Sequence, residues 1–398
     1  MKSEWKEYTL DEVCERIFSG GTPSTMHSEY WNGTLKWLSS GETSQRFIYD
    51  TERKITEIGV KNSSTKLATK GCTVIATAGQ GFTRGQASFL MTDTFLNQSV
   101  IACKANERFV LPLFLYYNLD NRYEEFRLLS DGTSTRGGLS GWILKRMTIL
   151  LPPLDEQKKI VDILEKIDRK IEVNNAINHN LLHQLALTFD QTYVTGRAGT
   201  LGELISVIES GSRPRGGAES HGIPSIGAEN IEKFGAYDFS KDKYISEQYF
   251  ASLNRGIVES RDVLLYKDGA YTGKVSMSLD GFPHKKCAVN EHVFILRTLN
   301  SRLQFSLYCL MARNDVRNKI YALASSKAAQ PGLNQNELRS VPINIPSESE
   351  LYKFEQYAEP MMHLIAKNAN ENKLLANLRD LLLPRIMSGE IDVSKVKI

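Results

Sequence analysis

Residues 160–185 read IVDILEKIDRKIEVNNAINHNLLHQL, and the spacing of their apolar side chains sets the organisation of the whole chain. One stripe advances by alternating steps of four and three residues, which is the spacing of a coiled-coil seam. Its members are Ile160, Leu164, Ile167, Ile171, Asn174, Asn178, Leu181 and Leu185. Two asparagines therefore interrupt an otherwise aliphatic stripe. A buried seam amide lowers stability but selects the register and the partner of a helix.

The same seam appears again further along the chain. Adding 194 to each number gives the positions Phe354, Ala358, Met361, Ile365, Asn368, Asn372, Leu375 and Arg379. Both asparagines recur in register, and only the last position departs from the pattern, where Leu378 or Leu382 can take over from the arginine.

These two helices are expected to pack against each other in antiparallel fashion. Asn174 should then meet Asn372, and Asn178 should meet Asn368. Any slip would place an amide against leucine and leave it unsatisfied. The alternative is a wet crossing at which the asparagines specify nothing.

The repetition extends to the segments before the helices. Four stretches recur: TLDEVCERIFSGGTP from Thr9 as TLGELISVIESGSRP from Thr200, KITE from Lys54 as YISE from Tyr244, TVIATAGQGFTRG from Thr73 as DVLLYKDGAYTGK from Asp262, and STRGGLSGWILKRMTILLP from Ser134 as KAAQPGLNQNELRSVPINIP from Lys327. A period of about 190 residues is too long for a solenoid repeat. It indicates two copies of a whole domain, each followed by its helix.

Short β-rich runs separated by glycine-rich turns, with helical patterns between them, predict an α+β domain in each copy. We expect domains at residues 1–153 and 196–346, the second including a linker at 196–200, long helices at 154–195 and 347–388, and a tail at 389–398. Each helix of about 40 residues would be ~60 Å long.

The composition fits a soluble globular protein without disulfides. The 398 residues carry a net charge of +3, with 41% hydrophobic and 24% charged residues. The polar start predicts no signal peptide, and no apolar run approaches a membrane span. Five scattered cysteines form no paired motif, so a reduced, cytoplasmic protein without a membrane partner is expected.

No motif predicts catalysis or metal binding. GAYTGK at Gly269 lacks the glycine spacing and the following Ser or Thr of a phosphate loop, so a turn in a sheet is expected. DEQK at 155–158 resembles part of a nuclease motif but falls in the first turn of a helix, where acids favour the dipole. His179 and His183 lie one helical turn apart without a third ligand nearby for zinc.

The repeated pattern resembles a known family. WKEYTLDEV, SGGTPS, KGCTVIATAGQG and GGLSGWILKRMTILLPPLDEQKKIVDILEKID are similar to specificity subunits of Type I restriction–modification systems. The similarity spans nearly the whole chain and is strongest where the PPLDEQK segment runs into the first long helix. The second copy lacks that segment, so the first helix is the better candidate for docking a partner.

The resemblance implies two tandem target-recognition domains, with the two long helices forming an antiparallel coiled coil of pseudo-twofold symmetry. Each domain would read half of a split site in double-stranded DNA, and because the domains differ, the site should be asymmetric. Two methyltransferase subunits that use SAM would join this chain, and two restriction subunits that use ATP and Mg would join that core. The chain itself would hold no cofactor or metal and catalyse nothing.

Side chains suited to base edges and phosphates gather in matching loops of the two copies. In the first copy the candidates are Arg46, Gln80, Thr83, Arg84, Gln86, Ser134, Thr135 and Arg136. In the second copy they are Arg213, Arg215, Asn230, Lys267, Tyr271, Thr272, Lys274, Lys285, Ser325, Ser326, Lys327 and Gln330.

Three other functions fit parts of the pattern. A system of the Type IIB kind, with a fused methyltransferase–nuclease partner, would use an equivalent chain. The other two are an enzyme acting on nucleotides through GAYTGK, which loss of an ATPase on replacing Lys274 by alanine would support, and a coiled-coil adaptor that binds only protein, which specific DNA footprinting by the complex would exclude.

Overall fold

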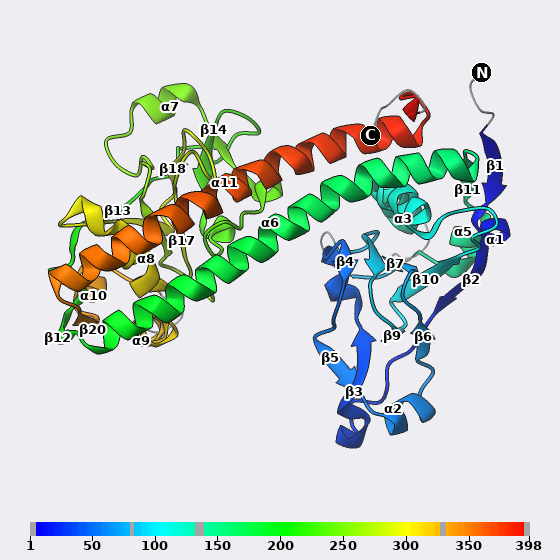
Figure 1. Cartoon of the computed structure of the whole chain (residues 1–398), viewed down its shortest axis with the longest axis horizontal. Coiled ribbons are helices and arrows are strands. Elements are labelled where there is room, and N and C mark those ends of the chain that lie inside the picture. The colour runs from blue at the N-terminus through cyan, green and yellow to red at the C-terminus, as the bar shows by residue number, and fades with distance from the viewer. Residues whose placement is uncertain (1–4, 80–82, 132–138, 327–331, 394–398) are drawn as a thin grey trace. The chain divides into compact units, whose positions relative to one another are not determined.

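The computed structural model describes residues 5–79, 83–131, 139–326 and 332–393. The chain forms two compact units (Figure 1). Unit 1 comprises Met1–Ile167 and Asn377–Ile398, and unit 2 comprises Asp168–Ala376. Each unit therefore contains a globular domain together with parts of two long helices, α6 (Leu154–Val194) and α11 (Glu348–Met387). Within the described ranges, no helix is long and apolar enough to cross a membrane.

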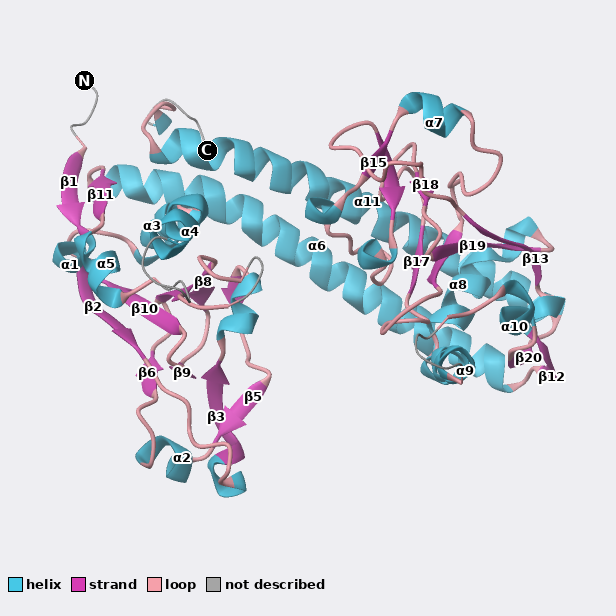
Figure 2. Ribbon diagram, turned by 180° about the vertical axis from the view of Figure 1, so that it is seen from behind, coloured by secondary structure: helices cyan, strands magenta, loops and turns pink. Residues whose placement is uncertain are grey.

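Unit 1 contains two sheets and a short ribbon (Figure 2). The main sheet has the order β2 (Cys14–Ser19), β10 (Val100–Ala105), β7 (Thr73–Ala76), β8 (Ala87–Leu90) and β4 (Phe47–Ile48). The second sheet has the order β5 (Arg53–Ile55), β3 (Trp31–Leu38), β9 (Thr94–Leu96) and β6 (Lys66–Ala68). The ribbon pairs β1 (Lys6–Thr9) with β11 (Thr148–Leu151).

Unit 2 repeats this arrangement, but its described strands include no counterparts of β4 and β6. Its main sheet has the order β13 (Ile205–Ser210), β19 (Val293–Thr298), β16 (Val263–Tyr266) and β17 (Val275–Met277). Its second sheet has the order β15 (Tyr244–Ile245), β14 (Ile223–Ile226) and β18 (Ala288–Val289), and its ribbon pairs β12 (Arg197–Thr200) with β20 (Pro342–Ile345). The one parallel pair of each second sheet also corresponds, β3 with β9 and β14 with β18. The predicted duplicated α+β architecture is confirmed.

The alignment of the two hairpins from sequence is wrong by one residue. Ile75 pairs with Ile101, and Leu265 pairs with Phe294 at the equivalent place, so Thr73 matches Val263 rather than Asp262. The alignment from sequence places Val74 opposite Val263 because both are valine, and this choice shifts the register by one residue.

The helical patterns that follow β10 and β19 each form two helices. These are α3 (Pro112–Asp120) and α4 (Tyr123–Asp131) in unit 1, and α8 (Gln304–Ala312) and α9 (Asn314–Ser325) in unit 2. Arg313 is extended (φ −61°, ψ 137°) and ends α8. Helices α3 and α8 are apolar on nearly every side because they pack within the cores of their units. The shorter helices are α1 (Leu10–Val13), α2 (Glu57–Lys61), α5 (Gly141–Arg146), α7 (Glu247–Ala251) and α10 (Gln335–Arg339).

The first turn of α6 is joined to its own unit. Gln157 is fully buried and accepts a hydrogen bond from the Leu111 N–H (2.9 Å), next to the start of α3. Its amide also donates to the carbonyl oxygens of Phe109 and Pro152, both at 2.9 Å. Trp5 donates to the carboxylate of Glu156 (3.2 Å). Two side chains of the PPLDEQK segment therefore make internal contacts.

The asparagines meet in unit 2, where the C-terminal part of α6 packs against α11. Asn174 donates to the side-chain oxygen of Asn372, and Asn368 donates to that of Asn178, both at 2.9 Å. Because the lower number on α6 pairs with the higher number on α11, these segments run antiparallel. Asn178 also donates to the Ile365 carbonyl (3.3 Å).

Other positions of the second seam differ from the prediction. Met362 is fully buried whereas Met361 is only partly buried, so the stripe shifts by one residue there. Leu378 is exposed, and Arg379 itself is buried beside Asp380, to which it is ion-paired at 2.8 Å. Leu382 is partly buried in the core of unit 1.

Candidate nucleic-acid interface

Several of the loops that carry candidate residues lie together at one end of the main sheet in each unit. In unit 1 the Leu139 N–H donates to the Thr77 carbonyl (3.2 Å), and in unit 2 the Leu333 N–H donates to the Lys267 carbonyl (3.1 Å). Each bond joins a hairpin loop, between β7 and β8 in unit 1 and between β16 and β17 in unit 2, to the residue two positions before α5 or α10, Leu139 or Leu333. Two stretches more than 50 residues apart in sequence thus share one surface.

A third loop joins this surface in both units. Asn97 and Asn290 each accept a hydrogen bond from the N–H two residues later, at 2.9 Å, forming a tight side-chain turn. The carbonyl two residues after each asparagine then accepts from the hairpin, from the Thr77 N–H (2.8 Å) and from the Lys267 N–H (3.1 Å).

The fourth loop follows β2 and β13. Thr22 donates to Gln98 (2.5 Å) in unit 1, and Arg213 is ion-paired with Glu291 (2.9 Å) in unit 2. We call these four segments the loop cluster. It comprises residues 20–23, 77–79, 83–86, 97–99 and 139 in unit 1 and residues 211–215, 267–274, 290–292 and 332–333 in unit 2.

Sequence reasoning missed the third loop and its contacts. Asn-x-Ser at 97–99 and Asn-x-His at 290–292 recur at an offset of 193, and this shared turn signal was available in the letters. It was overlooked because the flanking residues differ between the copies.

The hairpin of unit 1 contributes three half-buried candidates, Thr83, Arg84 and Gln86. The Gln86 N–H donates to the Thr83 carbonyl (3.2 Å), which closes the turn. Arg46 stands just before β4, beside the strand that leaves this hairpin, and is ion-paired with Asp120 (2.8 Å). Four candidates, Gln80, Ser134, Thr135 and Arg136, lie outside the described residues.

The hairpin of unit 2, residues 267–274, contains GAYTGK and leads into a strand rather than a helix. Tyr271 is 64% exposed, and the Lys274 ammonium lies over its ring at 4.7 Å. Lys274 is also paired with Glu232 (2.8 Å), and Lys267 with Asp268 (3.3 Å). Both lysines are half-buried, and each ammonium is held beside a carboxylate at the surface of the hairpin.

The remaining candidates of unit 2 fall into two groups. Arg215, Lys285, Ser325 and Ser326 are exposed, whereas Asn230 and Thr272 are buried. The Asn230 side chain accepts from the Gly227 N–H (2.9 Å), and the Thr272 hydroxyl donates to the Gly269 carbonyl (2.8 Å). Both buried side chains brace turns in this structure. Lys327 and Gln330 lie outside the described residues.

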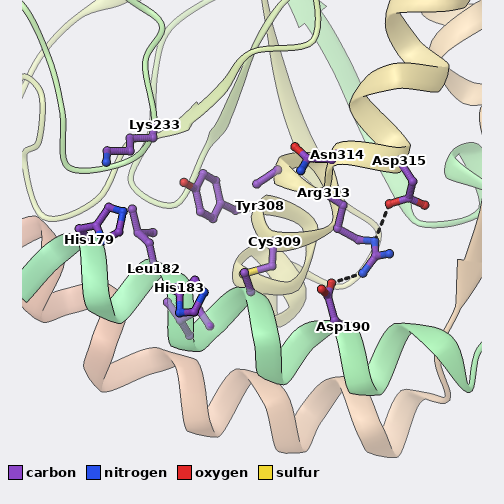
Figure 3. A pocket seen from close by; sticks show the side chains of 13 residues that line it. His179, Leu182, His183, Asp190, Lys233, Tyr308, Cys309, Arg313, Asn314 and Asp315 are labelled. Atoms are coloured by element: carbon purple, nitrogen blue, oxygen red, sulfur yellow. Dashed lines mark hydrogen bonds and ion pairs between the residues drawn. The ribbon is translucent and has the colours of Figure 1, made fainter. Parts of the chain in front are cut away.

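A cleft of about 520 Å³ lies between α6 and the α8–α9 pair of unit 2 (Figure 3). His179 and His183 point into it from α6, opposite Tyr308 and Cys309 of α8. Burial raises the pKa of the Cys309 thiol, which keeps it protonated and unreactive. Arg313 is ion-paired with Asp190 and, at 2.9 Å, with Asp315. Within the described residues, no three His, Cys, Asp or Glu side chains are grouped to hold a metal.

The architecture therefore defines a class of protein with two similar α+β domains, a loop cluster on each and a long helix after each. The family model described as "Type I restriction modification DNA specificity domain" matches residues 2–183. The Type I restriction enzyme MjaIX specificity subunit of Methanocaldococcus jannaschii is 24% identical over 99% of this chain and 95% of that protein. The HindI specificity subunit of Haemophilus influenzae is 21% identical over 98% of this chain and 100% of that protein.

A solved structure has the same fold. The crystal structure of the Type I restriction–modification S subunit from M. genitalium covers 96% of each chain at 16% identity, with a TM-score of 0.58. Residues 2–183 thus match the Type I specificity domain, and nearly the whole chain is similar to Type I restriction enzyme specificity subunits.

Proposed function

We propose that this chain reads a bipartite, asymmetric site in double-stranded DNA, with one half-site read by each unit. As a specificity subunit the chain recognises DNA and leaves catalysis to its partners. The observation that supports recognition of two half-sites is the loop cluster, which is formed by equivalent backbone hydrogen bonds in both units. Because the side chains of the two clusters differ, the two half-sites should differ in sequence.

Exposed and half-buried side chains in and beside each cluster are the proposed DNA contacts. They are Arg46, Thr83, Arg84 and Gln86 in unit 1 and Arg213, Arg215, Lys267, Tyr271, Lys274, Ser325 and Ser326 in unit 2. Gln80, Ser134, Thr135, Arg136, Lys327 and Gln330 are proposed from sequence alone. Asn230 and Thr272 are proposed to shape turns, and Lys285 to contribute positive charge.

The partners proposed for the chain are two SAM-dependent methyltransferase subunits and two restriction subunits that use ATP and Mg. The long helices are the proposed docking surface, and the first is favoured because it follows the PPLDEQK segment. Gln157 and Glu156 are engaged within unit 1, so docking would use the exposed residues of α6.

The experiment is to express the chain with its methyltransferase in a host free of adenine methylation and to map methylated adenines by long-read sequencing. One split, asymmetric motif that disappears without this chain is the expected result. Unchanged methylation in an assembled complex would contradict the proposal and favour a protein-only adaptor. A fused methyltransferase–nuclease as the partner would indicate the Type IIB-like alternative.

Variants of the two clusters test the assignment of half-sites. Arg84→Ala should relax one half-site and Tyr271→Ala the other, each by roughly 10- to 100-fold at individual bases. Lys353→Ala, an exposed lysine on α11 away from both clusters, is the control and should change neither. If both cluster variants relax the same half-site, the division of labour between the units is wrong.

A further inference from the structure

The two units differ in one connection between their sheets. In unit 1 only residues 91–93 join β8 to β9, whereas in unit 2 residues 278–287 join β17 to β18. This connection therefore has ten residues in unit 2 and three in unit 1. Asp280 and Pro283 of this connection contact α11, as described next, whereas His284 and Lys286 are paired with Asp242 and Glu247 of the same domain.

The extra connection contains a tight turn with the sequence LDGF at 279–282. The Leu279 and Phe282 backbones exchange two hydrogen bonds, at 3.1 and 2.9 Å. Asp280 and Gly281 both have positive φ, 51° and 80°, as a two-residue hairpin turn of this type requires. Phe282 is buried edge-on against Phe234. The turn is therefore anchored in the core at its base and presents Asp280 at its tip.

Three side chains on one face of α11 hold this turn. The Asp280 carboxylate is paired with His363 (2.5 Å), and the Asp280 carbonyl accepts from Asn370 (3.0 Å). The Lys373 ammonium donates to the Pro283 carbonyl (3.3 Å) and lies over the Phe239 ring at 4.1 Å. These contacts tie two separate loops of the domain to the helix.

A strained arginine adds a fourth contact. Arg261 occupies a left-handed conformation (φ 75°) at the turn where unit 1 has Gly71 (φ 89°). A side chain in that conformation costs about 1–2 kcal/mol compared with glycine. The guanidinium of Arg261 is paired with Glu359 on α11 (2.5 Å) and lies over the Phe305 ring at 4.7 Å. The contact with α11 offers a reason for an arginine where glycine fits better.

Three of the four helix residues are replaced by other residue types in α6, and only the glutamate recurs. Glu359, His363, Asn370 and Lys373 correspond, 194 residues earlier, to Glu165, Arg169, Ala176 and His179. Close to this contact the domain also reaches the asparagine seam. A Cβ at Gly235 would lie 2.7 Å from Ile365 and 3.2 Å from the Asn178 amide. The second domain is therefore joined to α11 beside the seam and by contacts of its own.

We infer that residues 278–287 and Arg261 form a latch that holds the second recognition domain in one orientation on α11, which makes Asn370 and Lys373 positioning residues for the second half-site. This inference rests on the proposed function. A recognition domain held in one orientation contacts its half-site at one fixed distance from the other half-site. Loosening the latch should let that distance vary while the reading side chains stay unchanged.

The test uses the complete complex with its methyltransferase and a library of duplexes in which the spacer between the half-sites varies. The Asn370→Ala/Lys373→Ala variant should raise methylation at spacers one base pair longer or shorter by about tenfold relative to the natural spacer. Lys367→Ala is the matched control, because it removes an exposed lysine from the same helix. Arg261→Gly is the second variant, and it removes the Glu359 contact while relieving backbone strain.

The outcomes separate the latch from the proposed function. A selective wild-type complex with both variants equally selective would overturn the latch alone. Equal relaxation in Lys367→Ala would also overturn it, because general weakening of the helix would then be the cause. A uniform loss of rate at every spacer would show a merely structural role and count against positioning. A wild-type complex without bipartite selectivity would overturn the proposed function, and the latch with it.

Discussion

Unit 1 and unit 2 share the order of their corresponding strands but join their domains to the long helices by different chemistry. Unit 1 uses the neutral amide of Gln157 beside α3, and unit 2 uses the carboxyl group of Glu355, which accepts from the Ser306 N–H of α8 (2.6 Å). Glu355 is 7% exposed, and burial raises its pKa to about 7. The residue 194 positions earlier is the buried Val161. Topology thus persisted through the duplication, while the polar contacts at the helix were replaced.

The largest effect is expected from removing the amide of unit 1. Gln157→Leu would leave the Leu111 N–H and two carbonyl oxygens unsatisfied in the core, at a cost of ~3 kcal/mol or more in unfolding free energy. Hydrogen exchange should show faster opening of α3, with little change in α8. Lys158→Leu, at the exposed neighbouring position, is the control. Equal loss of protection in both units would mean that Gln157 does not act on unit 1 alone.

The carboxyl group of unit 2 should make stability depend on pH. Because the pKa of Glu355 is about 7 in the folded state and 4.5 ordinarily, the folded state binds more protons between these values. The stability of unit 2 should therefore fall as the pH rises through this window. Glu355→Gln, which keeps an acceptor for Ser306, should stabilise the protein by about 3 kcal/mol at pH 8 and have little effect at pH 4.

Urea unfolding of Glu355→Gln at both pH values checks this prediction. Glu348→Gln, which changes an exposed carboxyl in the first turn of α11, is the matched control. A stabilisation that is equal at pH 4 and pH 8 would contradict the assignment to ionisation of Glu355.

The seam asparagines should lower the stability of the protein while fixing the register of α6 against α11. Replacing Asn174, Asn178, Asn368 and Asn372 by leucine is expected to raise Tm by a few degrees, since apolar seam residues pack better than paired amides. The same variant should allow more than one alignment of α6 against α11 and so broaden the spacers that are methylated. A single unchanged spacer would mean that other contacts, such as those of residues 278–287, set the register.

The smallest effect concerns the two equivalent left-handed turns. Gly71→Ala should cost ~1 kcal/mol by thermal unfolding, because alanine is strained at φ 89° and its Cβ meets nothing within 4 Å. Arg261→Gly should change the unfolding free energy by less, since relief of strain offsets the lost pair with Glu359. A loss from Arg261→Gly that exceeds the loss from Gly71→Ala would show that the Glu359 pair outweighs the strain.

The local pattern of the sequence was sufficient for much of this architecture. Heptad spacing located α6 and α11, because a helix repeats every 3.6 residues and its buried stripe is visible in the letters. The recurrence of Asn174 and Asn178 at Asn368 and Asn372 predicted the antiparallel pairing that the hydrogen bonds display. Glycine-rich turns between β-rich runs likewise located the hairpin at 267–274.

The three-dimensional structure decided what lies between those elements. Asn230 and Thr272 have the chemistry of DNA contacts, but each is buried and bonded to its own turn. Gln157 belongs to the segment that pointed to the first helix as a docking surface, and its side chain is enclosed beside α3. These outcomes depend on residues distant in sequence, because burial is set by neighbours that the chain brings in from elsewhere. The sequence by itself determined the helical periodicity, the duplication of the domain and the asparagine positions of the seam. Only tertiary packing decided which polar side chains face solvent, because a local pattern does not show which distant residues will cover a side chain.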